Sequence, residues 1–298
     1  GGFPMFHAAG VLPGALSSMF AGVELIIPTT TLMRNRGVVK NYWDLSAYYR
    51  VTSMSGAPTI LSTLTDVSLD GHDFSHLKGC RTGTAAIPSE LSKRFEQIVK
   101  VPILESYGMT EMTGLSSVTP YGVNAPPGCA GITIPYGRYK LVAMDPEGNP
   151  QTREVRQGET GLILYKGPNT FAGYLDPEAT KKTFTDDGWL ITGDLGFIDE
   201  EEMLHVTGRA KDLIIRSGHN IDPKMIEDAL SQHPDVVLSA AIGAPDEYAG
   251  ELPVAFVTLK TNSLVTEAEL LEFAARNVNE PPARPKSITI LQEMPLTN

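Results

Sequence analysis

Three stretches of this 298-residue sequence combine aromatic, hydroxyl, carboxylate and small residues in patterns that suit ligand binding. In "ESYGMTE", Tyr107 could stack on a base, Thr110 could bond a phosphate, and Glu111 could hold a magnesium ion through its oxygens. Gly108 lies between the aromatic residue and the hydroxyl residue. The alternative for this stretch is an ordinary exit from a strand into a loop.

A run of small residues, Gly83-Thr84-Ala85-Ala86, lies between a predicted strand and a helix that begins near Ser89. Small residues let a flat ring approach the backbone, and the N-terminus of the helix nearby favours phosphate. A tight turn is the simpler structural interpretation of this run.

Two charged residues further along could complete such a site. Asp194 stands between glycines in "GWLITGDLG", where a carboxylate on a turn suits a bidentate bond to a ribose diol. Arg209 has the fork geometry that suits phosphate or ribose oxygens. An Asp-containing β-turn and a solvated surface charge are the corresponding alternatives.

The sequence lacks the motifs of several other binding and enzyme classes. The sequence contains no dinucleotide-binding glycine fingerprint, no P-loop, no helical zinc motif and no nucleophile elbow. His72 and His76 have the spacing of helical metal ligands, but the segment "GHDFSHLKG" favours a surface loop. The only cysteines, Cys80 and Cys129, are too few for a disulfide framework or a zinc cluster, so a reducing cytoplasm is the default compartment.

The composition is typical of a globular protein with more than one domain. With 42% hydrophobic and 20% charged residues, the chain can bury a sizeable core. The net charge of -11 argues against nucleic acid and anionic membranes as main partners, since both select basic surfaces. The sequence shows neither a signal peptide nor an apolar run long enough to span a bilayer, so integral membrane contact is not expected. Because it starts on "GGFPMFHAAG", we expect an internal fragment.

The predicted elements alternate between strands and helices, which favours an α/β fold with a mostly parallel sheet. The clearest early helix is "PSELSKRFEQIVK", and strands are predicted at "GVELIIPT", "VTSMSGAP" and "VPILESYGM". From residue 131 to 207, short strands broken by Gly, Pro and Asp, without a convincing helix, predict a small β-rich subdomain.

A small α+β domain is predicted to follow. Asp222-Pro223 supplies an N-cap and an N1 proline for one helix, and Thr266 with Glu269 forms a capping box for another. "PVAFVTLK" and "SITILQ" are predicted strands. The sequence therefore predicts two domains, 1–208 and 209–298.

In this order, the segments "FPMFHAAG", "TGTAAIPSE", "ESYGMTE", "DGWLITGDLG", "GRAKDLIIRSGHNI" and "EMPLTN" resemble the adenylate-forming superfamily, and most of all its bacterial acyl-CoA synthetases. The resemblance implies activation of a carboxylic acid, fatty or related, by ATP and Mg²⁺ through an acyl-adenylate. Coenzyme A then accepts the acyl group. Positioning and charge neutralisation would carry both steps. The implied partners are small molecules, and a homodimer is compatible with the resemblance.

The resemblance also assigns roles to individual residues. Those expected at the nucleotide are Gly83, Thr84, Ala85, Tyr107, Gly108, Thr110, Asp194 and Arg209. The small-residue run and Tyr107 would frame the adenine, and Thr110 would touch the phosphate. Glu111 would ligate magnesium, while Asp194 would hold the ribose hydroxyls with Arg209 beside them.

Three further positions concern the acid and the motion between half-reactions. His7 matches a residue that lies by the acyl carboxylate and gates its pocket. Lys211 stands at the expected hinge of a small domain that rotates between adenylation and thioester formation. Ser217 and Gly218 would then face the active site, where glycine lets the pantetheine arm pass.

Two elements of the family are expected outside this chain. The Gly/Ser/Thr-rich phosphate loop should precede Gly1, and the lysine that contacts the α-phosphate should follow Asn298 closely. We therefore expect weak nucleotide binding and no useful ligase turnover from the chain alone. The alternatives are an adenylation domain that loads a carrier protein and a non-catalytic member that binds only nucleotide or partners. The intact hydroxyl and charged site residues argue against the second.

Overall fold

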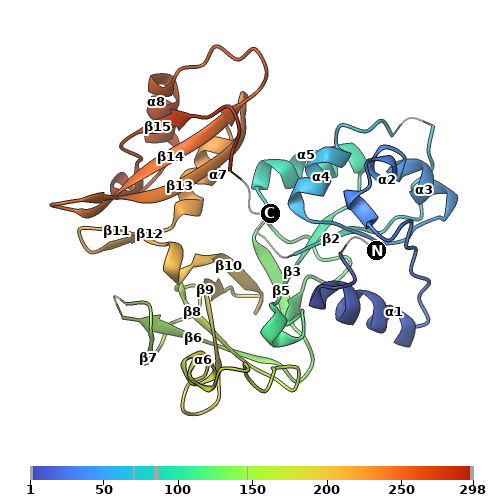
Figure 1. Cartoon of the computed structure of the whole chain (residues 1–298), viewed down its shortest axis with the longest axis horizontal. Coiled ribbons are helices and arrows are strands. Elements are labelled where there is room, and N and C mark those ends of the chain that lie inside the picture. The colour runs from blue at the N-terminus through green and yellow to red at the C-terminus, as the bar shows by residue number, and fades with distance from the viewer. Residues whose placement is uncertain (1–2, 70, 84–86, 146, 296–298) are drawn as a thin grey trace. The chain divides into compact units, whose positions relative to one another are not determined.

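The computed structural model of the protein describes residues 3–69, 71–83, 87–145 and 147–295. The chain forms two compact units (Figure 1). Unit 1 comprises Gly1–Asp145, Asn149–Thr192 and Gly196–Val206, and unit 2 comprises Pro146–Gly148, Gly193–Leu195 and Thr207–Asn298. The main chain passes from one unit to the other between Val206 and Thr207, whereas the predicted domain boundary at 208–209 stays a prediction.

A ten-stranded sheet has the order β1-β2-β3-β4-β5-β10-β9-β8-β6-β7. Its strands are β1 Met54–Ser55, β2 Cys80–Thr82, β3 Ile103–Tyr107, β4 Ser117–Val118, β5 Cys129–Thr133, β6 Arg138–Met144, β7 Pro150–Glu154, β8 Gly161–Lys166, β9 Leu190–Ile198 and β10 Leu204–Arg209. The α/β class with a β-rich part is confirmed. Parallel pairs join β1 to β2 and β2 to β3. The pairs β3–β4, β4–β5, β5–β10, β6–β7 and β6–β8 are antiparallel. β4 returns from β3 through a short loop, and such direct returns give antiparallel pairs.

Unit 1 contains nine helical segments within the described residues, of which α4 and α5 pack in one core with the parallel strands. They are η1 Gly10–Leu16, α1 Ser17–Phe20, η2 Leu32–Arg34, α2 Arg36–Lys40, α3 Tyr42–Tyr48, α4 Pro58–Leu64, α5 Ser89–Val99, η3 Thr110–Met112 and α6 Pro177–Thr183. Leu61 of α4 and Phe95 of α5 are fully buried in one core with Trp43, Cys80 and Ile103. Burying such large apolar side chains stabilises the fold by about 1.5–3 kcal/mol each.

Two local predictions in unit 1 are wrong. Residues 22–29, the predicted strand "GVELIIPT", form no strand, although their apolar run favours one; instead Val23 and Leu25 help to line a pocket. The β-rich region contains α6, whose N-cap Asp176 accepts from the backbone N–H of Glu178 and whose Pro177 occupies the first turn. This N-cap–proline pair is a local helix signal.

Unit 2 is the predicted small α+β fold. Its strands are β11 Ile214–Arg216, β12 His219–Ile221, β13 Val236–Asp246, β14 Gly250–Leu259 and β15 Ile288–Ile290, and its helices are η4 Ala210–Asp212, α7 Pro223–Ser231, α8 Glu267–Asn277 and η5 Pro281–Ala283. The side chain of Asp222 caps α7, and the capping box of Thr266 and Glu269 is formed at α8. Ile226, Leu230 and Leu270 lie in one core with the strands.

Both cysteines lie inside unit 1. Cys80 and Cys129 are free and buried, and burial raises the pKa of each thiol. In the described ranges, no helix has the length and apolar character needed to cross a bilayer.

Candidate functional site

The loop that follows β3 carries three of the predicted site residues of unit 1, Gly108, Thr110 and Glu111. Met109 precedes η3, and Thr113 and Gly114 close the turn with φ of 57° and 91°. A Cβ at Gly108 would lie 2.6 Å from the carbonyl oxygen of Gly114, so only glycine fits there. The sequence thus folds residues 109–115 back onto the end of β3.

A distant segment, residues 167–174, holds this loop, and we name it the clamp. Asn169 donates from Nδ2 to the carbonyl oxygens of Met112 at 2.7 Å and Leu115 at 2.9 Å. Thr113 donates from Oγ1 to the carbonyl oxygen of Asn169 at 2.6 Å. The backbone N–H of Phe171 donates to the carbonyl oxygen of Glu111 at 2.9 Å. Sequence reasoning missed the clamp, since nothing in its local pattern points to a loop more than fifty residues earlier.

The clamp also bonds the carboxylate of Glu111. The hydroxyl of Tyr174 donates to Oε1 at 2.5 Å. That hydrogen bond, with desolvation and the nearby negative charge, raises the pKa of Tyr174 to about 12, so the hydroxyl stays protonated near neutral pH. The carboxylate is therefore oriented before any ligand is bound.

Glu111 is compatible with the predicted magnesium ion. Within the described residues there is no group of three His, Cys, Asp or Glu side chains that could hold a metal. Mg²⁺ does not require one, because it usually takes one or two carboxylates together with substrate phosphates and water. A carboxylate with one oxygen bonded to Tyr174 keeps further lone pairs for such a role.

The predicted small-residue run is described only at Gly83, because Thr84, Ala85 and Ala86 lie outside the described residues. A Cβ at Gly83 would lie 2.8 Å from Oγ of Ser106, which itself donates to the carbonyl oxygen of Thr82 at 3.0 Å. β2 and β3 therefore end side by side at close approach. The ring of Tyr107 packs against the buried Met112 and Tyr165.

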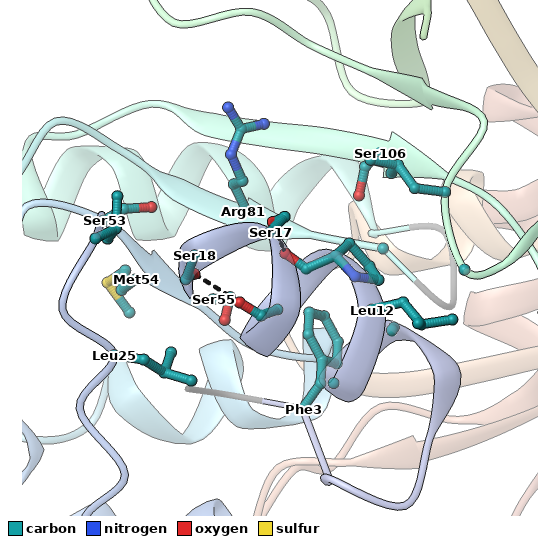
Figure 2. Close-up of a pocket in the computed structure, with 18 of the residues that line it drawn as sticks. Phe3, Leu12, Ser17, Ser18, Leu25, Ser53, Met54, Ser55, Arg81 and Ser106 are labelled. Atoms are coloured by element: carbon teal, nitrogen blue, oxygen red, sulfur yellow. Dashed lines mark hydrogen bonds between the residues drawn. The ribbon is translucent and has the colours of Figure 1, made fainter. Parts of the chain in front are cut away.

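A pocket of about 920 Å³ opens beside these strand ends in unit 1 (Figure 2). His7, Gly83 and Gly108 all line it, so the structure brings these three predicted residues together. His7 is exposed, and its Nδ1 accepts from the backbone N–H of Ala9 at 3.1 Å. Three other predicted residues of unit 1 that the structure describes, Tyr107, Thr110 and Glu111, do not line the pocket.

In unit 2 the structure joins the two residues predicted for the ribose. Nε of Arg209 lies 3.0 Å from Oδ1 of Asp194, whose side chain is 13% exposed. Asp194 lies in β9 after Gly193, which has a φ of 75°, and not on the β-turn considered from sequence. A half-buried carboxylate beside a more exposed guanidinium gives an acceptor and a donor suited to a diol or a phosphate.

The remaining predicted residues of unit 2 lie in exposed turns. Lys211 is exposed in η4 and has no ion pair with any residue that the structure describes. Ser217 and Gly218 form the two-residue turn between β11 and β12, with φ of 49° and 83°. A positive φ at both positions is typical of a tight hairpin turn, which glycine favours.

The chain is similar to known enzymes over nearly its whole length. It is 37% identical over 294 residues to a marinolic acid–CoA ligase of a Pseudoalteromonas species, covering 99% of this chain and 45% of that protein. It is 32% identical over 298 residues to a long-chain-fatty-acid–CoA ligase of Bacillus subtilis, covering 99% and 50%. The chain spans about half the length of the curated relatives it matches.

A solved structure and two family models agree with these relatives. ATP-bound MatB from Rhodopseudomonas palustris matches with a TM-score of 0.88 at 30% identity, over 99% of this chain and 56% of that chain. Residues 225–298 match the C-terminal domain of the AMP-binding enzymes. Residues 2–175, more than half of the chain, match the AMP-binding enzyme domain itself, so the chain belongs to the family of AMP-binding, adenylate-forming enzymes.

Proposed function

We propose that the protein carrying this chain is an acid–thiol ligase that activates a carboxylic acid with ATP and passes the acyl group to coenzyme A. The pocket of about 920 Å³ carries the proposal, because His7, Gly83 and Gly108 share its wall at the ends of β2 and β3. The relatives named as CoA ligases support it.

The strand ends and the loop 109–115 would bind the nucleotide. Gly83 and Gly108 permit close approach to the backbone, as a flat base requires. Tyr107, with Thr84 and Ala85, would complete the adenine site. Thr110, exposed at the start of η3, would donate to the phosphate.

Glu111 would be the protein ligand of a magnesium ion, which when bound would neutralise charge on the phosphates. The clamp supports this role because it fixes the carboxylate through Tyr174 and the backbone through Phe171. In unit 2, Asp194 would accept from the ribose hydroxyls, and Arg209 would donate beside them.

The change between half-reactions would be carried by the segment around Lys211, between domains 1–208 and 209–298. Lys211 is exposed and lies three residues after Gly208, so a rotation there would break no buried ion pair of its own among the described residues. Ser217 and Gly218 would then present a turn without a bulky side chain to the pantetheine arm of coenzyme A.

The acid would be fatty or related, since apolar side chains such as Phe3, Leu12 and Leu25 line much of the pocket (Figure 2). The protein would work in the cytoplasm, where its two thiols stay reduced. His7, at the pocket wall, would lie near the reacting carboxylate.

The test is ATP–pyrophosphate exchange by the full-length protein across a panel of carboxylic acids, followed by transfer to coenzyme A or to a carrier protein. We expect exchange with at least one acid and transfer to coenzyme A. Transfer only to a carrier protein would make the protein a carrier-loading enzyme. No exchange with any acid would contradict adenylation.

A further inference from the structure

One face of the parallel strands forms a wall of the pocket. Ser55 of β1 and Arg81 of β2 pair in register and therefore lie on the same face of the sheet. Cys80, on the opposite face, joins the core with α4 and α5. Arg81, Ser55 and Ser106 all line the pocket, and Figure 2 shows them with other serines among its apolar side chains. A cation is thus built into a mainly apolar site.

The guanidinium of Arg81 is held by neutral groups. Nη1 donates to the carbonyl oxygen of Thr119 at 3.2 Å. The guanidinium carbon lies 4.5 Å from the centre of the Tyr121 ring, whose hydroxyl donates to Oγ of Ser53 at 2.7 Å. Within the part of the chain that the structure describes, no carboxylate forms an ion pair with Arg81.

A half-buried guanidinium held in this way favours an anion. It has five N–H donors, and the bond to Thr119 uses one of them. Burying a charge is costly unless a partner compensates it. Among the described residues that line the pocket, the only carboxylate is the exposed Glu24, whereas Arg50 adds a second cation.

The guanidinium of Arg81 and the ring of Tyr121 lie toward the N-terminal ends of β1 and β2. Met54 pairs with Cys80, which places Ser53 beside Gly79, and a Cβ at Gly79 would lie 3.3 Å from Cε1 of Tyr121. Gly83 lies at the C-terminal end of β2. It follows Gly79 by four residues, which is roughly 13 Å at about 3.3 Å per strand residue. The pocket therefore has a glycine-lined end and a cationic end.

We propose that Arg81 binds a second oxyanion at the distal end of the substrate, so that the preferred substrate is a medium-length dicarboxylic acid. The inference rests on the proposed ligase function, which places the reacting carboxylate near His7 and the nucleotide at Gly83 and Gly108. The acyl chain then runs along the apolar wall, and its terminal carboxylate accepts from the guanidinium, with Ser53 and Ser55 as further polar neighbours. Charge-assisted, forked bonding of this kind is the usual way that arginine recognises carboxylates.

The test compares matched acids of equal length: adipic with hexanoic, suberic with octanoic, and sebacic with decanoic acid. In pyrophosphate exchange by the full-length protein, kcat/KM should be higher for the dicarboxylic member of at least one pair. Arg81→Met should lower that value on the order of 10- to 100-fold, while the monocarboxylic acid is unaffected or improved. Arg81→Lys should retain part of the preference.

The matched control is Arg94→Met, because Arg94 is an exposed arginine of α5 that pairs with Asp66; its acid preference should equal that of the unmodified protein. A preference of the unmodified protein for monocarboxylic acids overturns the proposal, even if Arg81→Met fails to fold. Equal loss for both acids in Arg81→Met overturns it as well, since Arg81 is then structural. Exchange without a dicarboxylate preference defeats this inference alone, whereas no exchange with any acid defeats the proposed function.

Discussion

The loop 109–115 in unit 1 and the segment 207–222 in unit 2 carry predicted site residues in opposite ways. The loop is bonded by Asn169, Phe171 and Tyr174 of the clamp, which lie far away in sequence. In the second segment Arg209 and Lys211 are exposed. Under the proposed function, the group that stays in place is held by long-range bonds, whereas the group that changes partners is exposed to solvent.

From this contrast we expect variants in the two regions to differ in how they change activity and the free energy of unfolding. A change in the loop should affect the chemistry of one bound state, because its backbone stays fixed by the clamp. A change at the exposed Lys211 should affect the balance between states, because no ion pair within the described residues fixes its side chain. Variants in each region can test this difference.

The largest effect is expected for Glu111→Gln. The amide keeps an oxygen that can accept from Tyr174 but loses the negative charge, so pyrophosphate exchange should fall about 10²–10³-fold. The unfolding free energy should change by less than about 1 kcal/mol, measured by urea denaturation. The control is Glu90→Gln, an exposed carboxylate of α5 that pairs with Lys93. Equal losses of folding and activity would show that Glu111 is structural.

Lys211→Pro tests the second region. Proline fixes φ near one value and removes the backbone donor, so only one orientation of the segment should remain accessible. We expect one half-reaction to be largely spared and the other to fall about 100-fold, since misplacement of the reacting groups costs this much. Single-turnover assays of adenylation and thioester formation measure each step. Lys211→Ala, which keeps backbone freedom, is the control, and a parallel fall of both steps would exclude Lys211 as the pivot.

Tyr174→Phe should have a smaller effect that isolates the clamp. Without the hydroxyl, the Glu111 carboxylate loses a bond that orients it, so the Mg²⁺ concentration for half-maximal exchange should rise about tenfold. Because the pKa of Tyr174 is raised to about 12, the effect should not vary with pH near neutrality. Tyr136→Phe, at an 88% exposed position, serves as control. An unchanged Mg²⁺ requirement would separate Tyr174 from the metal site.

The smallest effect concerns Asp222, the N-cap of α7, whose carboxylate contacts Gly208. Desolvation raises its pKa; Lys224 opposes the shift, while Asp228 and Asp212 add to it. The contribution of Asp222 to the free energy of unfolding is therefore fully present below the usual carboxyl pKa. It is lost as the pH rises through the raised pKa of the folded state.

Asp222→Asn keeps the cap and removes the charge, so the two proteins should differ by less than about 1 kcal/mol. Hydrogen exchange of the α7 amides against pH measures this difference. We expect the asparagine variant to be at least as stable at neutral pH and to lack this part of the pH dependence. Identical pH profiles would exclude Asp222 as its source.

Local signals predicted the elements that depend on local bonds. The caps of α7 and α8 formed because Asp222 and Thr266 bond the first turn of their own helices. The same signal at Asp176 could have predicted α6. By contrast, the antiparallel part of the large sheet and the irregular segment 22–29 depend on which strands pair in the tertiary fold, and a single stretch of sequence does not determine that pairing.

The same distinction between local signals and tertiary contacts applies to the candidate site. The loop after β3 was predicted from "ESYGMTE", and Gly108 lies where a side chain would not fit. The clamp was not predictable, because Asn169 and Tyr174 reach the loop only through the tertiary fold. Arg81 was also missed: in sequence it is one charge in a short strand, and only strand register places it on the pocket wall.

The burial of both cysteines has a consequence for selectivity among acceptors. An acyl-adenylate reacts with an accessible thiolate, and the thiolate fraction falls as the pKa rises. Cys80 and Cys129 are buried with raised pKa values, so both are protonated and shielded. Under the proposed function, these two thiols would therefore not compete with the incoming thiol for the activated acid.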